Sequence, residues 1–299
     1  MNAQETEQFL TTLAEGLVFP RRAPILKRPD EIGLEYEDVF FAAIDGVPLE
    51  GWLMPADSNQ LVICNHFGPA NRQGYPGHVE PWNTARGIEV DFLPKYKALH
   101  DAGYNVLAYD FRNHGMSGSG AGGRVGNGVI EWRDVIGSIR YARARPETAK
   151  MTTHLQSLCM GANATLFAMK RHPEEFEQIA SLILLQPLVG STFVEQVCAP
   201  AGIENAVEQF DAILRRMSSF RVADQEVRPY AECVDVPTFV VQVKEDLMSR
   251  ASDVQEIHDA IPVADKKLFW IEGTTLRHHG YTYFSEHPEQ MIEWYDAHS

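Results

Sequence analysis

The sequence Met151-Thr-Thr-His-Leu-Gln-Ser-Leu-Cys-Met-Gly-Ala-Asn-Ala-Thr-Leu-Phe-Ala-Met169 changes character at Cys159. A short apolar run of strand length precedes the cysteine, and small residues typical of a tightly packed helix follow it. The turn Ser157-Leu-Cys-Met-Gly161 has the spacing of G-x-S-x-G, a strand-to-helix turn that exposes a nucleophile, with Ser for the first Gly and Cys for the nucleophilic Ser. Such a crowded turn requires small residues two positions before and after the nucleophile, and Ser157 and Gly161 provide them. We therefore interpret Cys159 as a candidate nucleophile; the alternative is a buried thiol that fills the core.

The composition is that of an ordinary globular protein with a strong negative charge. The 299 residues carry a net charge of −15, which argues against nucleic acid or an anionic membrane surface as a partner. We find no basic-then-apolar leader and no apolar run of the ~20 residues that would span a bilayer. The four cysteines fit neither a zinc pattern nor a dense disulfide framework; they are Cys64, Cys159, Cys198 and Cys233. We expect a cytoplasmic protein with free thiols, no metal and no cofactor.

Short apolar runs alternate with helical patterns through most of the chain. The expected strands after the first hairpin are residues 61–64, 105–109, 151–158, 181–185, 238–243 and 267–271. Before them, residues 37–43 and 49–54 flank Asp45-Gly46, a hairpin turn signal. This order predicts an α/β fold with a mostly parallel central sheet, helices on both faces and an antiparallel N-terminal hairpin.

Two segments lie outside this alternation. Residues 1–33 form a predicted helical extension, in which residues 3–17 carry apolar side chains at helical spacing. This helix packs either on its own subunit or on a partner, so a homo-oligomer remains open. Residues 190–233 show helical patterns without a strand and predict a small helical cap on a single domain that spans residues 1–299. The long loop 65–89 is expected to be functional, because long loops in compact domains rarely are idle.

One glycine-rich motif is misleading. Gly118-Ser-Gly-Ala-Gly-Gly123 matches the G-x-G-x-x-G pattern of dinucleotide-binding proteins. That pattern must follow its strand directly, with an acidic residue closing a second strand about 20 residues later. Here the turn of residues 110–117 intervenes and residue 140 falls inside a predicted helix, so we interpret the motif as a loop.

Four landmarks resemble those of one superfamily: Asp45-Gly-Val-Pro-Leu-Glu-Gly-Trp52, Asn65-His-Phe-Gly68, Asp110-Phe-Arg-Asn-His-Gly-Met-Ser117 and Ser157-Leu-Cys-Met-Gly161. From residue 37 to its end, the chain resembles the α/β-hydrolase superfamily. The cysteine is similar to that of dienelactone hydrolases and polyhydroxyalkanoate synthases, and the length resembles esterase relatives of the former. The N-terminal helix and the 65–89 loop depart from the smallest dienelactone hydrolases.

In this arrangement the nucleophile is followed along the chain by an acid and then a histidine. Asp246 follows the predicted strand 238–243, and we prefer it to its neighbour Glu245. His279 follows the strand 267–271, and we prefer it to His278, which stays an alternative. Both residues are expected in loops at the carboxyl ends of strands, where open α/β sheets place their ligands.

The oxyanion of an acyl-transfer intermediate needs backbone donors. We expect the N–H groups of Met160 and Phe67, with Gly68 as the alternative to Phe67; His66 is expected to fix the loop. The substrate pocket is expected between the cap and the 65–89 loop. Its apolar walls are expected to be Trp82, Phe193, Phe210 and Met217, each of which could equally belong to the core of the cap.

These residues predict an acyl hydrolase that cleaves an ester, lactone or thioester of a small to medium apolar substrate. Cys159, His279 and Asp246 would act as a triad and form a thioacyl-enzyme. Two alternatives use the same fold: an acyltransferase or lactone-forming enzyme, and a catalytically silent protein that binds small molecules. The expected partner is a small-molecule acyl substrate.

Overall fold

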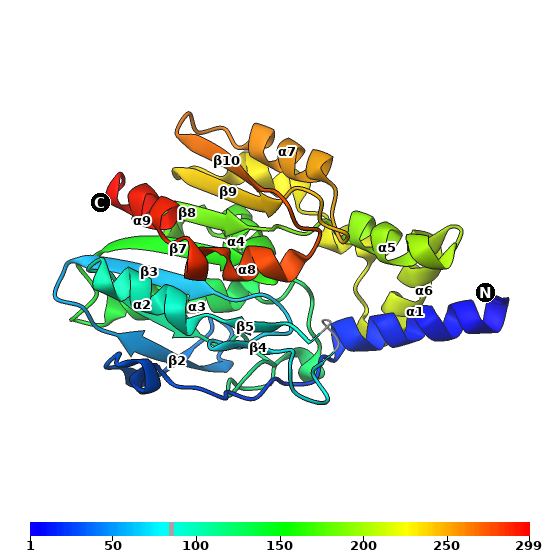
Figure 1. The fold of residues 1–299 in the computed structure, drawn as a ribbon, viewed down its shortest axis with the longest axis horizontal. Coiled ribbons are helices and arrows are strands. Elements are labelled where there is room, and N and C mark those ends of the chain that lie inside the picture. The colour runs from blue at the N-terminus through cyan, green and yellow to red at the C-terminus, as the bar shows by residue number, and fades with distance from the viewer. Residues whose placement is uncertain (84–86) are drawn as a thin grey trace.

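A computed structural model describes residues 1–83 and 87–299, and within them eight strands form one sheet (Figure 1). The strand order is β1-β2-β6-β3-β7-β8-β9-β10. The strands are β1 (Glu37–Ala42), β2 (Pro48–Met54), β3 (Gln60–Asn65), β6 (Asn105–Tyr109), β7 (Thr152–Leu158), β8 (Ile179–Leu185), β9 (Thr238–Val243) and β10 (Lys266–Ile271). From β6 to β10 every neighbouring pair is parallel, whereas β1–β2 and β2–β6 are antiparallel. The predicted fold class is therefore confirmed.

The sheet is buried on both faces. Along β3, Leu61 and Ile63 join one apolar cluster, while Val62 and Cys64 join a second cluster on the opposite face. This alternation follows from the two-residue period of a strand. Helices α3 (Trp132–Ala144), α4 (Met160–Arg171) and α7 (Ala251–Ala260) contribute to the first cluster, and α2 (Leu93–Asp101), α8 (Arg277–Glu286) and α9 (Glu289–Asp296) to the second.

A third apolar cluster lies beyond the end of the sheet, between α1 (Ala3–Val18), α5 (Gly190–Cys198) and α6 (Ala206–Ser218) (Figure 1). We call these three helices the cap. Leu10, Ala14 and Val18 of α1 are buried there with Phe210 and Leu214 of α6. Each fully buried Leu, Val or Phe contributes roughly 1.5–3 kcal/mol to stability. The N-terminal helix therefore packs on its own chain and completes the cap.

Shorter elements complete the description. The 65–89 loop contributes β4 (Gly74–Pro76), which pairs with β5 (Glu89–Asp91); residues 84–86 of this loop lie outside the described residues. The 3-10 helices are Pro29–Ile32, Ala121–Gly123, Pro173–Glu175, Ala199–Ala201, Val222–Gln225 and Arg228–Cys233. Among the described residues, none of the helices has the length and apolar character needed to cross a bilayer.

The helix α8 differs from the sequence interpretation, which placed the histidines in a loop. It begins at Arg277 and contains Gly280, and no side chain caps its N-terminus. Glycine inside a helix and a missing cap both weaken the helical signal in a sequence. The consequence is large, because consecutive residues in a helix point in directions about 100° apart.

Candidate active site

Cys159 occupies a strained turn between β7 and α4. Its backbone has φ 49° and ψ −106°, a conformation that residues other than glycine rarely adopt. The Cys159 amide donates to the Leu185 carbonyl at 2.8 Å. A Cβ on Gly161 would lie 2.5 Å from the Asn65 carbonyl oxygen and 2.8 Å from that of His66, so only glycine fits there. The turn thus has the local geometry that the spacing of small residues predicts.

Ser157 ties this turn to the neighbouring strand. Its hydroxyl accepts a hydrogen bond from the Asn65 side-chain amide at 2.8 Å and lies 2.8 Å from the Thr165 hydroxyl. The Asn65 amide oxygen in turn accepts from the Tyr109 hydroxyl at 2.7 Å. All four side chains are fully buried, so this satisfied network fixes the turn relative to β3. Serine in place of the usual glycine therefore has a structural role here.

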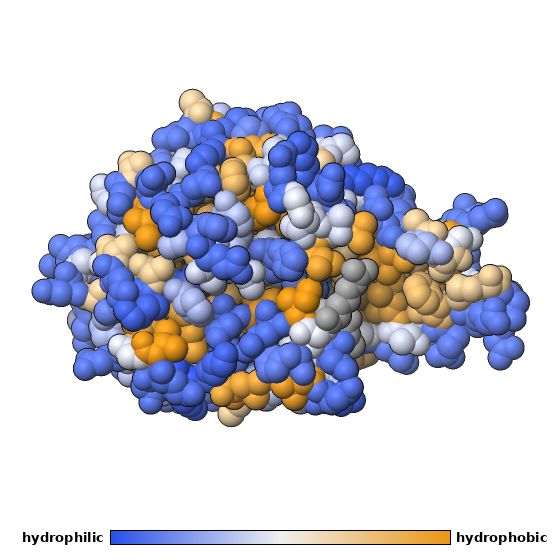
Figure 2. All heavy atoms as spheres, in the orientation of Figure 1, coloured by the Kyte–Doolittle hydropathy of each residue, from blue (hydrophilic) through white to orange (hydrophobic). Residues whose placement is uncertain are grey.

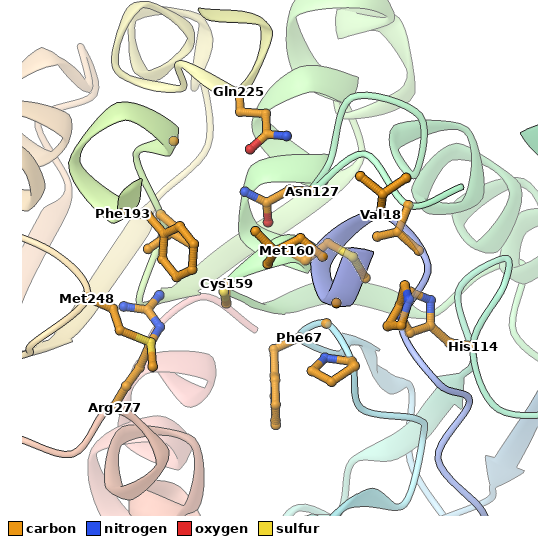
Figure 3. Close-up of a pocket in the computed structure, with 18 of the residues that line it drawn as sticks. Val18, Phe67, His114, Asn127, Cys159, Met160, Phe193, Gln225, Met248 and Arg277 are labelled. Carbon is orange, nitrogen blue, oxygen red and sulfur yellow. The ribbon is translucent and has the colours of Figure 1, made fainter. Parts of the chain in front are cut away.

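A cavity of about 260 Å³ lies between the cap and the carboxyl ends of the strands, and Cys159 lines it (Figure 3). The thiol residue is only 6% exposed. The walls are mostly apolar and include the expected Phe193 and Phe210. Leu17 and Val18 of α1 also line the cavity, which the sequence did not reveal. Figure 2 shows apolar side chains gathered where the cap meets the body of the molecule.

Two of the expected wall residues lie elsewhere. Trp82 packs against the core cluster of α2, α8 and α9, and its carbonyl accepts the Tyr75 hydroxyl at 2.8 Å. Met217 packs within the apolar cluster of the cap. Neither residue is among those that line the cavity. Met217 therefore lies in the core of the cap, which was the alternative to a place in the pocket wall.

Phe67 and Met160, the expected sources of oxyanion donors, both belong to the wall of the cavity. Both residues line the cavity beside Cys159, and among the described residues neither N–H has a hydrogen-bond acceptor. Met160 is the first residue of α4, where backbone N–H groups lack helical partners and carry the positive end of the helix dipole. Gly68, the alternative to Phe67, also lines the cavity.

The side chains that α8 directs toward the sulfur are Arg277 and Tyr281. Four residues separate them, so they share one face of the helix, and Arg277 Nε donates to the Tyr281 hydroxyl at 2.7 Å. Both are buried, and Figure 3 shows the Arg277 guanidinium beside Cys159. Burial lowers the pKa of Arg277, but Tyr281, Cys159 and Asp246 outweigh it, so the pKa is raised well above its ordinary value. Burial raises the pKa of Tyr281 well above its ordinary value, and the nearby Cys159 adds to this rise.

Asp246 pairs with Arg277 instead of a histidine. One carboxylate oxygen accepts from Arg277 Nη1, from the Ser249 hydroxyl at 2.7 Å and from the Gln242 amide at 3.1 Å. The other accepts from the Met248 N–H at 3.0 Å. This carboxylate is fully engaged, and it orients the guanidinium that lies beside Cys159. Asp246 therefore occupies the expected place but holds an unexpected partner.

The two histidines of α8 have different surroundings. His278 lines the cavity, with its ring 6.3 Å from that of Phe67, and burial followed by the charge of Arg277 lowers its pKa to about 4. His279 is exposed, and its Nδ1 lies 2.7 Å from the Thr274 hydroxyl. The structure therefore does not bring His279 to the cavity, because the helix turns it outward. His278, the alternative, is the histidine of the two that lines the cavity.

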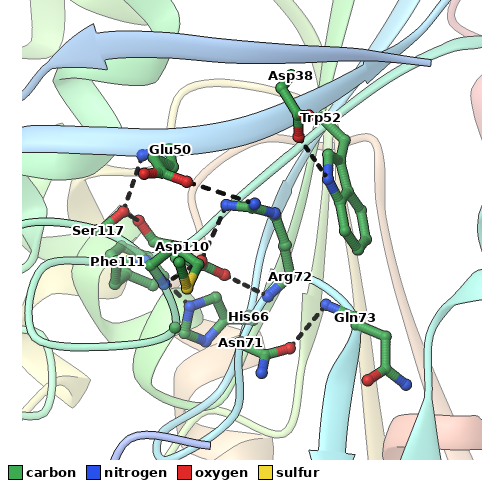
Figure 4. A network of polar contacts seen from close by, with 12 residues as sticks. Asp38, Glu50, Trp52, His66, Asn71, Arg72, Gln73, Asp110, Phe111 and Ser117 are labelled. Atoms are coloured by element: carbon green, nitrogen blue, oxygen red, sulfur yellow. Dashed lines mark hydrogen bonds and ion pairs between the residues drawn. The ribbon is translucent and has the colours of Figure 1, made fainter. Parts of the chain in front are cut away.

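His66 fixes the loop that carries Phe67. Its Nε2 accepts the Phe111 N–H at 3.0 Å, and its Nδ1–H therefore donates to the Phe67 carbonyl at 2.8 Å. Burial lowers the pKa of His66 to about 4, which keeps the ring neutral. Beside it, Arg72 donates to Asp110 at 3.0 Å and joins the loop to the turn after β6 (Figure 4). This agrees with the structural role expected for His66.

We found no cluster of three His, Cys, Asp or Glu side chains that could hold a metal ion among the residues that the structure describes. The polar side chains that line the cavity include the Cys159 thiol, the Arg277 guanidinium and the Tyr281 phenol. Arg277 and Tyr281 are the residues that sequence reasoning missed. The sequence signal was the four-residue spacing between Arg277 and Tyr281. This spacing places two side chains on one face only in a helix, and the helix α8 was not predicted.

Comparison with solved structures defines the class. The chain has the α/β-hydrolase fold, which it shares with an esterase of Pyrococcus furiosus, Pf2001, at a TM-score of 0.70 and 22% identity over 94% of this chain and 98% of that one. A dienelactone hydrolase of Anabaena variabilis matches at 0.56 and 13% identity, covering 89% and 98% of the two chains. The α/β hydrolase GrgF of a Penicillium species matches at 0.58 and 17%, covering 89% and 99%. No protein-family model and no curated protein matches the sequence.

Proposed function

We propose that this protein is an acyl hydrolase that cleaves an ester or thioester through a thioacyl intermediate on Cys159. One observation carries the proposal. The sulfur lies at a strained strand-to-helix turn, in the wall of an apolar cavity, beside two backbone N–H groups that have no acceptor among the described residues. Structurally similar proteins described as esterases and hydrolases support the same reaction class. The cavity volume of about 260 Å³ suits a small to medium acyl group.

Arg277 replaces the expected imidazole as the group beside the sulfur. The thiolate, and not the thiol, is the nucleophile, and an adjacent cation together with a helix N-terminus stabilises its negative charge. In this mechanism the Cys159 proton leaves to water, and Asp246 holds the guanidinium in place. Tyr281, whose hydroxyl accepts from Arg277 Nε at 2.7 Å, also lines the cavity.

Acylation then needs no further protein base. The thiolate adds to the carbonyl carbon, and the oxyanion accepts the Phe67 and Met160 N–H groups, each of which contributes roughly 3 kcal/mol to the transition state. Collapse of the intermediate breaks the bond to the leaving alkoxide or thiolate, which takes a proton from water. In deacylation, His278 accepts a proton from the attacking water, and the acid and the Cys159 thiolate are released. A neutral His278 is available for this step because its pKa is about 4.

A second candidate is acyl transfer or lactone formation. It is favoured by the low exposure of Cys159, 6%, because a site that admits little water favours another acceptor over hydrolysis. The same acyl-cysteine serves both reactions. Products formed with and without added alcohol, amine or thiol, analysed by mass spectrometry, separate them.

The decisive experiment is intact-mass spectrometry after exposure to p-nitrophenyl esters and acyl thioesters. We expect a mass gain equal to the acyl group, mapped to Cys159 by peptide digestion. The Cys159→Ala variant should show neither the gain nor turnover. Cys233→Ser is the matched control, since Cys233 is more exposed than the other three cysteines, which are all buried. Full activity of Cys159→Ala would overturn the mechanism, and a folded protein without adduct or turnover would favour the silent small-molecule-binding protein.

A further inference from the structure

The cavity contains a polar group that the proposed mechanism does not use. His114, in the turn after β6, lines the cavity but lies apart from Cys159, with Met160 between them in the view of Figure 3. Its side chain is buried, with 1% exposure. The ring Nδ1 lies 2.8 Å from the Arg112 carbonyl oxygen and must carry the hydrogen, because a carbonyl can only accept. The Nε2 lone pair has no partner among the described residues and less than 1 Å² of accessible surface, so a ligand group reaches it by displacing a neighbouring side chain.

The surrounding turn holds this imidazole rigidly. The His114 N–H donates to the Phe111 carbonyl at 3.0 Å, and the His66 ring lies 5.2 Å away in an edge contact. Gly115 permits the turn, since a Cβ there would lie 2.1 Å from an Asp110 carboxylate oxygen. The His114 Nε2 atom therefore has a fixed position. A ligand that binds it does not have to order the His114 side chain, so binding costs mainly the conformational freedom of the ligand itself.

The charge state of the ring defines what it can bind. Burial, followed by the nearby His66, lowers the pKa of His114 to about 3, so the ring is neutral at physiological pH. A neutral imidazole with Nδ1 engaged offers only an acceptor at Nε2. Arg22, whose guanidinium donates to the Gly115 and Ser117 carbonyls of the same turn, opposes the attraction that the nearby Asp110 carboxylate would exert on a cationic ligand. A neutral hydroxyl group satisfies both conditions.

The other polar groups of the cavity are less selective. Asn127 and Gln225 line it from the cap side, and their amides can donate or accept equally well. Apolar residues such as Val18, Val125 and Phe210 form much of the remaining wall. A buried acceptor among apolar walls lowers the affinity of any ligand that leaves it unpaired.

We propose that His114 Nε2 is a specificity-determining acceptor for a hydroxyl group on the acyl chain, remote from the carbonyl that Cys159 attacks. The substrates are then hydroxyacyl esters or thioesters whose intervening chain is hydrocarbon. This inference rests on the proposed function for the position of the carbonyl. The hydroxyl enters one end of the cavity while the reacting bond lies at the other.

The test compares ω-hydroxyacyl and methyl-terminated p-nitrophenyl esters of equal chain length across a series. We expect the wild-type protein to prefer the hydroxylated member in kcat/KM by about tenfold for at least one chain length, the worth of one net hydrogen bond. His114→Phe should abolish this preference, and His114→Gln, which keeps an acceptor oxygen, should restore part of it. His172→Gln, at the far end of α4, should leave the ratio unchanged. A ratio near one at every length in the wild-type protein overturns the inference and means that water satisfies Nε2.

Binding to an inactive protein separates this inference from the proposed function. Calorimetry with Cys159→Ala should show tighter binding of the ω-hydroxy acid than of the fatty acid of equal length. If that preference holds while the wild-type protein never forms an acyl adduct, the proposed reaction fails and the His114 subsite stands. If turnover is normal but neither kinetics nor binding shows a preference, the subsite fails alone. Should both His114 variants misfold, the wild-type ratio and the binding comparison still decide.

Discussion

Arg277 and Asp246 form a buried ion pair beside Cys159, with side-chain exposures of 3% and 1%. A buried pair of this kind contributes little net stability, but removal of one partner leaves an uncompensated charge and typically costs 3–5 kcal/mol. We therefore expect the pair to affect the reactivity of the Cys159 thiol and to add little to net stability. Its effects on folding and on the thiol can be measured separately.

We predict that Arg277→Met lowers the free energy of unfolding by about 3–5 kcal/mol, because Asp246 is left buried and unpaired. The double variant Arg277→Met/Asp246→Leu should recover much of that stability. In both variants, alkylation of Cys159 by iodoacetamide near neutral pH should be at least tenfold slower, because the guanidinium beside the sulfur is gone. Urea unfolding and mass-resolved alkylation measure the two effects. Recovery of alkylation in the double variant would contradict the role of Arg277.

The two histidines of α8 should differ sharply when substituted. His279→Gln changes an exposed side chain and should leave kcat/KM within about threefold of the wild-type value. His278→Gln removes the imidazole that lines the cavity and should slow deacylation at least a hundredfold, the usual worth of a general base.

Single-turnover kinetics will show which step changes. With His278→Gln, the burst of p-nitrophenol should persist while steady turnover falls and the acyl-enzyme accumulates. Loss of activity in His279→Gln with normal His278→Gln turnover would mean that α8 rearranges when substrate binds.

Gly161 offers a test of the turn itself. In Gly161→Ala the added Cβ meets two backbone oxygens at 2.5 and 2.8 Å, which can move only if the oxyanion loop shifts. We expect a stability loss of about 1–3 kcal/mol from this overpacking and a fall in kcat of at least tenfold. Gly16→Ala is the control for stability alone, since its Cβ meets nothing within 4 Å in α1 and should gain up to about 1 kcal/mol, whereas its place in the cavity wall excludes it as a control for kcat. Unchanged kcat in a folded Gly161→Ala protein would refute the coupling.

The parts of the site that follow from local sequence were predictable. The small residues around Cys159 dictate the turn, and the apolar runs that precede Asp246 and that end at Cys64 dictate strands whose carboxyl ends lie at the same edge of the sheet. The choice between His278 and His279 could not be predicted, because it depends on which residues of α8 face the cavity. Once α8 begins at Arg277, a shift of one residue separates a cavity position at His278 from an exposed one at His279.

Tertiary contacts decided the remaining residues. Trp82 and Met217 have the chemistry of pocket walls, but each satisfies its apolar surface in a neighbouring cluster. The apolar stripe of α1 predicts that the helix packs against another element, but the stripe does not indicate which element that is. The pairing of Arg277 with Asp246 spans 31 positions and depends on the fold as a whole.

Buried histidines predict a pH-dependent stability. Burial, with a smaller effect of His298, lowers the pKa of His154 to about 4, against the ordinary 6.5. Between these values the unfolded chain binds a proton at this site and the folded protein does not, so the free energy of unfolding falls as the pH drops. From pH 7 to pH 5 this site alone should cost about 2 kcal/mol.

A comparison of the wild-type protein with the His154→Gln variant separates this effect from that of other buried titrating groups. One such group is Asp134, because burial raises its pKa to about 7. His154→Gln keeps a polar side chain beside Ser181, its partner at 2.9 Å, but cannot titrate. Urea unfolding at pH 7 and pH 5 should show a loss of stability that is smaller by about 2 kcal/mol in the variant. Equal losses in the two proteins would mean that His154 titrates normally in the folded state.

The cap should affect substrate binding more than the chemical step, because α1 contributes walls to the cavity but no group beside the sulfur. Leu10 is fully buried between α1 and α6, so Leu10→Ala should cost about 2–5 kcal/mol, concentrated in the cap. We expect a raised KM with a nearly unchanged kcat, and faster amide hydrogen exchange in α1. Leu26→Ala, at a residue that is 42% exposed, is the control. If Leu10→Ala instead lowered kcat at constant KM, the cap would have to act on the reacting groups, through contacts that α1 does not make in this structure.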